Sequence, residues 1–308
     1  MWRSAFLALS TNRGVHHVAT RSTLAKKVAS RFIAGETLTT AIEAAREINR
    51  WGASVELDYL GESVLDERQA EEAAAAYLQI LDAIAEAGVG SHVSLKPSQM
   101  GQELSDTLCE QNIESVVERA AGYGSFVWVD MESSPYTERT VELYKRLRAR
   151  HENVGIALQA YLHRCKADLR EIVSVGGTIR LCKGAYQEPA QVAFPEKRDV
   201  DRNYALLSEM LLTSGLFQAL GTHDEKMIDH TVEFVKARDL SKEGFEFQML
   251  YGVRRDLQEK LIQEGYNLRV YVPFGDQWYP YFMRRLAERP ANLFFLMGNL
   301  AREAMPTR

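Results

Sequence analysis

Charged and polar side chains recur where the expected strands of this chain end, and these are the residues that could do chemistry. Lys96 follows the run "SHVSL" and Asp130 follows "FVWV". A cation beside a carboxylate suits the binding of an anionic substrate, although a buried structural ion pair accounts equally well for this spacing. Isolated charges in apolar strands are costly, so many of them together favour a site. The other strand ends carry Asp58, Gln159, Arg180 with Lys183, Thr222 with His223, Glu246 with Gln248, and Tyr271.

Two adjacent arginines near the C-terminus are a second candidate for anion binding. Arg284 and Arg285 lie within an expected helix over residues 276–289. Guanidinium groups bind carboxylates in a bidentate manner, although a doubled arginine is more often a solvated charge run. Glu288 lies four residues after Arg284 and three after Arg285, where it can orient either one. A role for the pair at the site requires this helix to fold over the strand ends.

Several common active-site patterns are absent from the sequence. It contains no HExxH, GxSxG, GxGxxG or GxxxxGK[ST] pattern, and we expect no metal centre. A lone histidine such as His223 is more often a hydrogen-bonded structural residue than a ligand or base. The three cysteines, Cys109, Cys165 and Cys182, form no CxxC pair and no disulfide framework, which suits a reducing compartment.

The elements that must position these groups alternate between strand and helix. Because parallel neighbours need crossover connections, this alternation predicts a parallel sheet. Eight such units predict closure into a (βα)₈ barrel, with its chemistry at the carboxyl ends of the strands; a doubly wound open sheet is the alternative. Strand-like runs cover residues 53–60, 92–98, 126–134, 154–162, 178–186, 217–224, 245–252 and 268–275. Helical patterns follow them at 71–90, 105–124, 136–151, 166–177, 201–215, 225–238, 254–265 and 276–289.

Length and composition limit the remaining possibilities. The chain has 308 residues, which suits either two domains or one barrel with an appendage. The eight units occupy nearly all of 53–289, so we expect a barrel domain over 53–308 and an N-terminal helical arm over 1–52. A net charge of −5 argues against a nucleic-acid partner. No apolar run approaches the roughly 20 residues needed to span a bilayer.

The first 35 residues contain no Asp or Glu and several basic residues. This composition is typical of an organelle transit peptide or, as we favour, of a basic arm. Such an arm would cover one end of the barrel, or it would contact an anionic membrane surface.

An ordered set of short motifs at successive strand ends resembles the proline dehydrogenase family. The segments are "SLKPS", "VDMES", "ALQAYL", "RLCKGAY", "GTHD", "FEFQMLYG", "RVYVPFG" and "YFMRRLAERPAN", within residues 36–300. The resemblance implies a distorted (βα)₈ barrel that binds FAD at its strand ends. It implies oxidation of L-proline to Δ¹-pyrroline-5-carboxylate by hydride transfer from C5 to flavin N5, with electrons passed to a quinone. This reaction is the first step of proline degradation to glutamate.

The same resemblance assigns roles to individual residues. Arg180 would lie near flavin N5, and Asp130 would lie beside Lys96 under the substrate. Tyr271 is the family residue that goes with proline and crowds out a 4-hydroxylated ring. Glu62 would form a gating ion pair with Arg284, with Asp58 as the alternative. The substrate carboxylate would be held by Lys96, Arg284 and Arg285, and the substrate walls would be Tyr271, Tyr186 and Leu250. FAD would contact Met131, Gln159, Lys183, Gly184, Ala185, Thr222 and His223.

The resemblance also implies partners. The chain is too short for a fused second enzyme, so we expect a monofunctional, bacterial-type protein whose product passes to a separate pyrroline-5-carboxylate dehydrogenase. Electrons would go to a membrane quinone, which places the protein in the cytoplasm, at or near the inner face of the cytoplasmic membrane. Two rivals stay open: a flavin barrel enzyme related to methylenetetrahydrofolate reductase, and a non-catalytic barrel that binds a small anion. A flavin spectrum recorded with and without proline would separate them.

Overall fold

Eight parallel strands form a closed barrel in which each strand pairs with the next in sequence and the last pairs with the first. The computed structural model describes residues 29–61 and 64–288, with side chains up to residue 283. The prediction of a (βα)₈ barrel is confirmed. The strands are β1 (Ser54–Tyr59), β2 (Ser91–Leu95), β3 (Val127–Val129), β4 (Val154–Gln159), β5 (Thr178–Cys182), β6 (Gln218–Gly221), β7 (Phe245–Leu250) and β8 (Leu268–Phe274).

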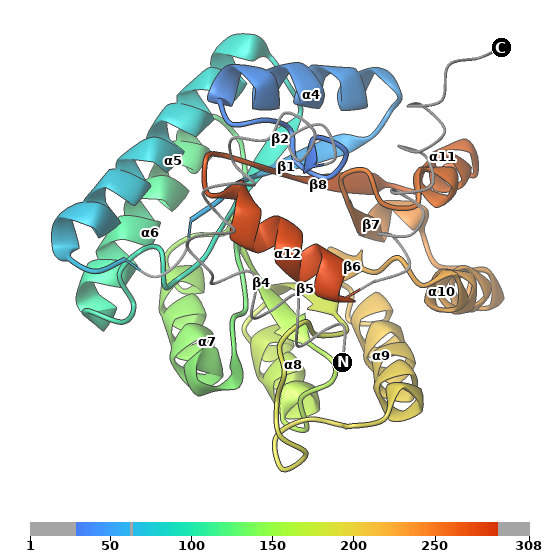
Figure 1. Cartoon of the computed structure of the whole chain (residues 1–308). Coiled ribbons are helices and arrows are strands. Elements are labelled where there is room, and N and C mark those ends of the chain that lie inside the picture. Colours follow the sequence, from blue (N-terminus) through green and yellow to red (C-terminus); the bar gives the residue numbers. More distant parts are fainter. Residues whose placement is uncertain (1–28, 62–63, 289–308) are drawn as a thin grey trace, which may run out of the picture.

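Helices connect the strands and surround the ring, as Figure 1 shows. Their apolar faces and the outward-facing side chains of the strands form one large hydrophobic core. The connecting helices are α5 (Glu67–Ala87), α6 (Asp106–Gly122), α7 (Ser134–Arg148), α8 (Cys165–Ser174), α9 (Lys197–Leu212), α10 (Glu225–Ala237) and α11 (Arg255–Gln263). None of the described helices is both long and apolar enough to cross a lipid bilayer.

The outer position between β8 and β1, which the helix after β8 would normally occupy, is taken by a helix that precedes β1. Helix α4 (Leu38–Arg50) packs outside β1 and β8 and next to α5, and its Ala41, Ala45 and Ile48 are buried in the main core. Helix α12 (Trp278–Glu288) follows β8, and in Figure 1 it lies across the ring of strands rather than outside it. Helix α4 lies in the range 1–52 expected as an N-terminal helical arm, and its buried residues belong to the same core as the barrel strands.

A second, smaller hydrophobic cluster joins the segment before α4 to α12. It contains Phe32, Trp278 and Phe282. Trp278 Nε1 also donates to Glu36 Oε1 at 2.9 Å. The segment passes so close to the loop after β7 that a Cβ at Gly252, which has a φ of +72°, would lie 1.7 Å from the carbonyl oxygen of Arg31. Glycine is therefore required at this contact.

Candidate active site at the carboxyl ends of the strands

The Lys96 ammonium group lies just beyond β2 and faces two carboxylates from neighbouring strands. Its Nζ donates to Asp58 Oδ1 of β1 at 2.8 Å and lies 3.7 Å from Asp130 Oδ2 after β3. The pairing of Lys96 with Asp130 that the sequence predicted is present, but Asp58 is the nearer partner. Burial would lower the pKa of Lys96, yet the charges of Asp58 and Asp130 outweigh it and raise that pKa, so the lysine stays protonated.

Asp130 is the centre of this cluster because it accepts hydrogen bonds from several strands. Its Oδ1 accepts from Ser94 Oγ of β2 at 2.9 Å and from the Arg180 guanidinium of β5. Its Oδ2 accepts from the Tyr271 hydroxyl of β8 at 3.0 Å. Four strand ends thus meet at one carboxylate, and the barrel closure between β8 and β1 is what brings Tyr271 and Lys96 to the same group.

Arg180 crosses the barrel interior and is held on several sides. Its Nη1 binds Glu56 of β1 and lies 3.2 Å from Gln248 Oε1 of β7, while its Nη2 donates to Ser94 Oγ at 3.0 Å. The guanidinium carbon lies 5.1 Å from the centre of the Trp128 ring and 5.5 Å from that of Tyr271. Burial would lower the pKa of Arg180, but its carboxylate partners raise it, so the guanidinium is a fixed positive charge.

Sequence reasoning gave Glu56 no role, although it lies at the heart of this network. In β1 the residues Val55 and Leu57 enter the hydrophobic core, whereas Glu56 and Asp58 alternate with them and bind cations from other strands. The sequence does carry a signal for this role. Two carboxylates two residues apart in an apolar strand point to the same face, and buried there they require cationic partners.

A second ionic group lies beyond β5 and β6, where the sequence predicted cofactor contacts. Lys183 Nζ binds Asp201 of α9 and lies 2.7 Å from Asp224 Oδ2, the N-cap of α10. Lys197 joins the same two carboxylates. Burial would raise the pKa of Asp224, but hydrogen bonds and charge from Lys183, then from Lys197, lower it to about 2. This group is distinct from the one around Asp130.

Between the two groups, the residues after β4 and β5 have the features of a binding surface for a flat polar ligand. Gln159 is buried, and its Nε2 donates to the Met131 carbonyl at 3.0 Å, but its Oε1 finds no hydrogen-bond partner among the described residues. A buried acceptor without a donor is costly, so a ligand N–H would satisfy it. Gly184 has a φ of +116°, and a Cβ there would lie 2.3 Å from the Tyr161 ring. The residues present therefore fit a flavin, to which Gln159 Oε1 would offer a hydrogen-bond acceptor.

Three further predicted residues lie at the ends of β6 and β7. His223 Nε2 accepts a hydrogen bond from the Leu250 backbone N–H at 2.7 Å, which leaves the ring proton of a neutral imidazole on Nδ1. Thr222 is buried, and its hydroxyl accepts from the Asp224 backbone N–H at 3.1 Å. These bonds fix the loops that carry the side chains, so His223 has at least a structural role.

The remaining predicted residues are more exposed or lie outside the described part of the chain. Ala185 and Tyr186 lie exposed in the loop after β5. Glu62 falls in the two-residue gap after β1, so the gate stays a prediction; Asp58, its alternative, is fully buried against Lys96. The side chains of Arg284, Arg285 and Glu288 lie beyond the described side chains, and only their helix, α12, is placed.

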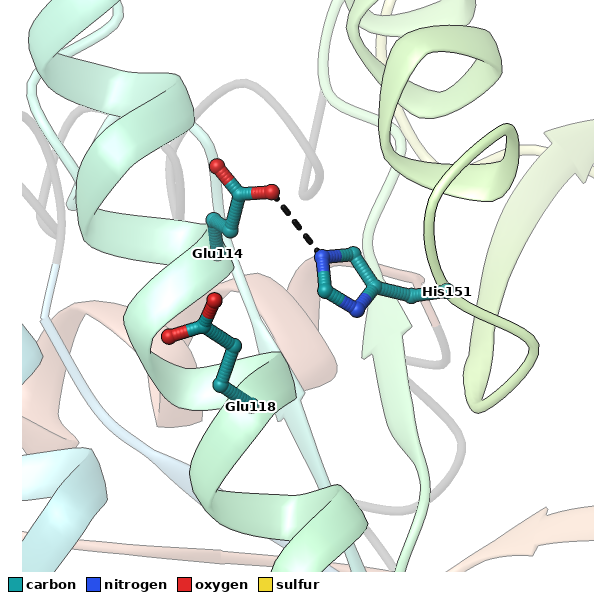
Figure 2. A group of neighbouring side chains, drawn as sticks. All are labelled: Glu114, Glu118 and His151. Atoms are coloured by element: carbon teal, nitrogen blue, oxygen red, sulfur yellow. Dashed lines mark hydrogen bonds and ion pairs between the residues drawn. The ribbon is translucent and has the colours of Figure 1, made fainter.

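One group of potential metal ligands occurs among the described residues, away from the strand ends. Glu114 and Glu118 lie one turn apart on α6, and His151 faces them from the loop after α7, as Figure 2 shows. Glu114 Oε1 is already 2.9 Å from His151 Nε2 and 2.7 Å from Arg150 Nε. A guanidinium on the same oxygen opposes a bound cation, so we interpret this group as an ionic contact that joins α6 to α7.

A closed (βα)₈ barrel with buried charged groups at the carboxyl ends of its strands is the arrangement of a barrel enzyme. The family model for proline dehydrogenase matches residues 41–297. Proline dehydrogenase 2 of Bacillus subtilis is 39% identical over 301 residues, 98% of this chain and 99% of the relative. Proline dehydrogenase of Deinococcus radiodurans is 39% identical over 305 residues, 97% of this chain and 98% of the relative.

Solved structures agree on the fold. The crystal structure of proline utilization A (PutA) from Bdellovibrio bacteriovorus, inactivated by N-propargylglycine, superposes with a TM-score of 0.81 at 24% identity. The match covers 91% of this chain and 34% of that longer one. The family model and the Bacillus and Deinococcus relatives show that the chain belongs to the proline dehydrogenase family. It is an enzyme, an oxidoreductase of the first step of proline catabolism.

Proposed function

We propose that the protein oxidises L-proline to Δ¹-pyrroline-5-carboxylate with FAD as the hydride acceptor and a membrane quinone as the final electron acceptor. The observation that carries the proposal is the buried Lys96–Asp58–Asp130 cluster next to Arg180 at the strand ends. It offers a charged lysine to a small anion, and its neighbours hold that lysine in one place. Family membership supports the reaction class, and the unpaired Gln159 Oε1 supports a flavin.

The substrate carboxylate is the strongest handle on a small zwitterion. In this proposal Lys96, Arg284 and Arg285 bind it, and Glu288 orients the two arginines. The placement of α12 after β8 and across the ring in Figure 1 supports this, because both arginines belong to that helix. Tyr271, Tyr186 and Leu250 form the walls around the ring, and Glu62 gates the site through Arg284.

The chain's own residues must then orient the substrate ring and control its amine proton. Hydride transfer needs the proline C5 within about 3–3.5 Å of its acceptor, and three cations on one carboxylate restrict the ring to a single orientation. A cationic surrounding lowers the amine pKa, so the nitrogen reaches the neutral form that can push electrons out. Asp130 restrains Lys96 through their ion pair and Tyr271 through its hydroxyl.

Bound FAD would supply the two-electron acceptor for this hydride. Met131, Gln159, Gly184, Ala185, Thr222 and His223 would hold it, with Lys183 fixed by Asp201 and Asp224 at the same edge. Arg180 is a buried positive charge that would stabilise the negative charge gained on reduction. The released product would pass to a separate dehydrogenase. A cytoplasmic protein, free or peripheral at the inner face of the cytoplasmic membrane, would be reoxidised there by a membrane quinone.

The first test is spectroscopic. Purified protein should show the absorbance of an oxidised flavin, and anaerobic L-proline should bleach it, whereas D-proline at the same concentration should bleach it far more slowly. Bleaching by a nicotinamide cofactor instead of proline would indicate a different flavin enzyme. A protein that stays colourless after incubation with FAD would refute the cofactor assignment.

A further inference from the structure

Glu56 is a fully buried carboxylate in the middle of β1. It lies opposite Tyr271 of β8 in the barrel register and two residues below Asp58, deeper in the barrel. One oxygen, Oε1, binds Arg180 Nη1, while Oε2 finds no hydrogen-bond partner among the described residues. Burying a carboxylate costs free energy, and the ion pair with Arg180 is the contact that offsets this cost for Glu56.

Two carboxylates hold opposite ends of the Arg180 guanidinium. Asp130 binds Nη2 from the open end of the barrel, and Glu56 binds Nη1 from the deeper side. Ser94 and Gln248 contribute neutral hydrogen bonds of 3.0 and 3.2 Å. A planar guanidinium anchored at only one end could turn about its Cδ–Nε bond, whereas a charge at each end fixes its plane.

The two carboxylates have different additional partners. Asp130 also contacts Lys96 and Tyr271, which are substrate-side groups in the proposed function. Among the described residues Glu56 contacts neither Lys96 nor Tyr271. It therefore offsets the Arg180 charge without being tied to the groups that would bind the substrate. Without it, Asp130 would be the one remaining carboxylate on Arg180 among the described residues, and its hold on Lys96 and Tyr271 would weaken.

We propose that Glu56 is a positioning residue for the proline dehydrogenase reaction: it fixes the plane of the Arg180 guanidinium, offsets its charge and leaves Asp130 free to organise Lys96 and Tyr271. This inference rests on the proposed function, because Arg180 would lie beside the flavin. A carboxylate next to that arginine lowers the net positive charge at the flavin, so it opposes reduction.

The decisive variant is Glu56→Gln, which keeps the shape and an acceptor oxygen but removes the charge. In the holoenzyme we expect a more positive flavin midpoint potential, because the unbalanced Arg180 charge favours the reduced form. We expect kcat about ten- to a hundred-fold lower because Arg180 and Asp130 shift, and a higher KM for proline because Asp130 then holds the substrate-side groups Lys96 and Tyr271 less firmly. The matched control is Asp168→Asn. It removes the charge of a buried carboxylate that binds Arg164 on the outside of the barrel, and it should leave the flavin midpoint potential unchanged.

A double-mutant comparison separates positioning from general damage. In an Arg180→Gln background, Glu56→Gln should no longer shift the midpoint potential, because the charge it offsets is gone. An unchanged potential in Glu56→Gln, or an equal shift in both backgrounds, would overturn the inference.

If Glu56→Gln does not fold, Glu56→Asp keeps the charge and withdraws the carboxylate by one methylene. It should lower kcat with little change in potential, and wild-type kcat in this variant would count against positioning. A wild-type protein without flavin would refute the proposed function, whereas a flavoprotein whose midpoint potential does not respond to Glu56 would refute only the role of Glu56.

Discussion

At the scale of single residues, the site is built from charges that are buried before any substrate arrives. Asp58 and Glu56 are fully buried on β1, and each depends on one cation from another strand. Burial raises the pKa of both carboxyl groups, and the cations oppose this increase. Removing one of these cations therefore leaves an unpaired carboxylate in the barrel interior. The same side chains thus determine both the stability of the fold and the binding of the substrate.

Replacing Lys96 should test this linkage. Lys96→Met removes the partner of Asp58, so we expect the free energy of unfolding to fall by about 3–5 kcal/mol, together with a large increase in the KM for proline. Chemical denaturation and steady-state kinetics measure the two effects. Lys145→Met is the control, since Lys145 pairs with Glu142 and Glu171 on the outer surface and should change both quantities little. A fully stable Lys96→Met protein would show that Asp58 has another partner.

Tyr271 should determine which ring the enzyme accepts. Its hydroxyl is fixed on Asp130, so the ring has little freedom to move away from a 4-hydroxyl group on the substrate. We expect Tyr271→Ser to increase the ratio of kcat/KM for hydroxyproline to that for proline by about tenfold or more. Tyr271→Phe, which keeps the ring, should retain the wild-type ratio. Equal ratios in the serine variant and the wild type would rule out Tyr271 as the wall.

The sequence predicted which residues lie at the site better than it predicted which of them contact one another. Lys96 and Asp130 were expected to pair because β2 and β3 are neighbours, and they do. The nearer contact with Asp58 was not expected, and Glu56 was not assigned, because attention to strand ends overlooks inward residues in mid-strand. Contacts such as Arg180 with Glu56 join residues 124 positions apart across the ring, and only the barrel geometry sets their distance.

At the scale of elements, the periodic patterns located the eight barrel strands and the α-helix that follows each of them among the described residues, but the expected strands were too long. The run over 126–134 contains a strand of three residues, Val127–Val129, and the rest is the loop that carries Asp130. The run over 178–186 likewise ends as a strand at Cys182. The sequence pattern does not show where these strands end, because the loop residues of the site follow the last strand residue directly. Helix α6 begins after its N-cap, Ser105.

Helix capping offers a test with an internal control. Ser105 Oγ accepts from the Leu108 backbone N–H at 3.3 Å, so Ser105→Ala should lower the free energy of unfolding by about 1 kcal/mol. Ser133 is the N-cap of α7 but makes no side-chain capping bond, so Ser133→Ala should be nearly neutral. Thermal or urea unfolding of both variants measures the difference. Equal losses in the two variants would contradict the capping argument.

At the scale of the whole molecule, stability should depend on pH through a histidine of β2, the register partner of Glu56. His92 lies largely buried on β2, and its Nδ1 has no hydrogen-bond partner among the described residues. Burial, and then the charge of Arg269, lower the pKa of His92 well below 6.5. The folded protein therefore keeps this ring neutral, while the unfolded chain takes up a proton below about pH 6.5. Stability must fall as the pH decreases through this range.

The corresponding prediction concerns the slope of stability against pH. Between pH 6.5 and 5.5 the wild-type protein should lose about 1 kcal/mol through this histidine, and His92→Phe should remove that part of the loss. Urea unfolding at several pH values measures it. His163→Phe changes an exposed histidine and should retain the wild-type slope. A slope unaffected by His92→Phe would mean that other groups cause the acid sensitivity.

The closure of the ring between β8 and β1 also has a consequence for synthesis. Arg269 Nη1 donates to the Val55 carbonyl at 2.8 Å across 214 positions of sequence. At about 5–20 residues per second, the ribosome needs roughly 10–40 seconds to make that stretch. Through this interval β1 exposes unpaired backbone groups that could recruit a strand from another nascent chain. Yield in the cell should therefore depend on chaperone protection of the first strand until the last one has emerged.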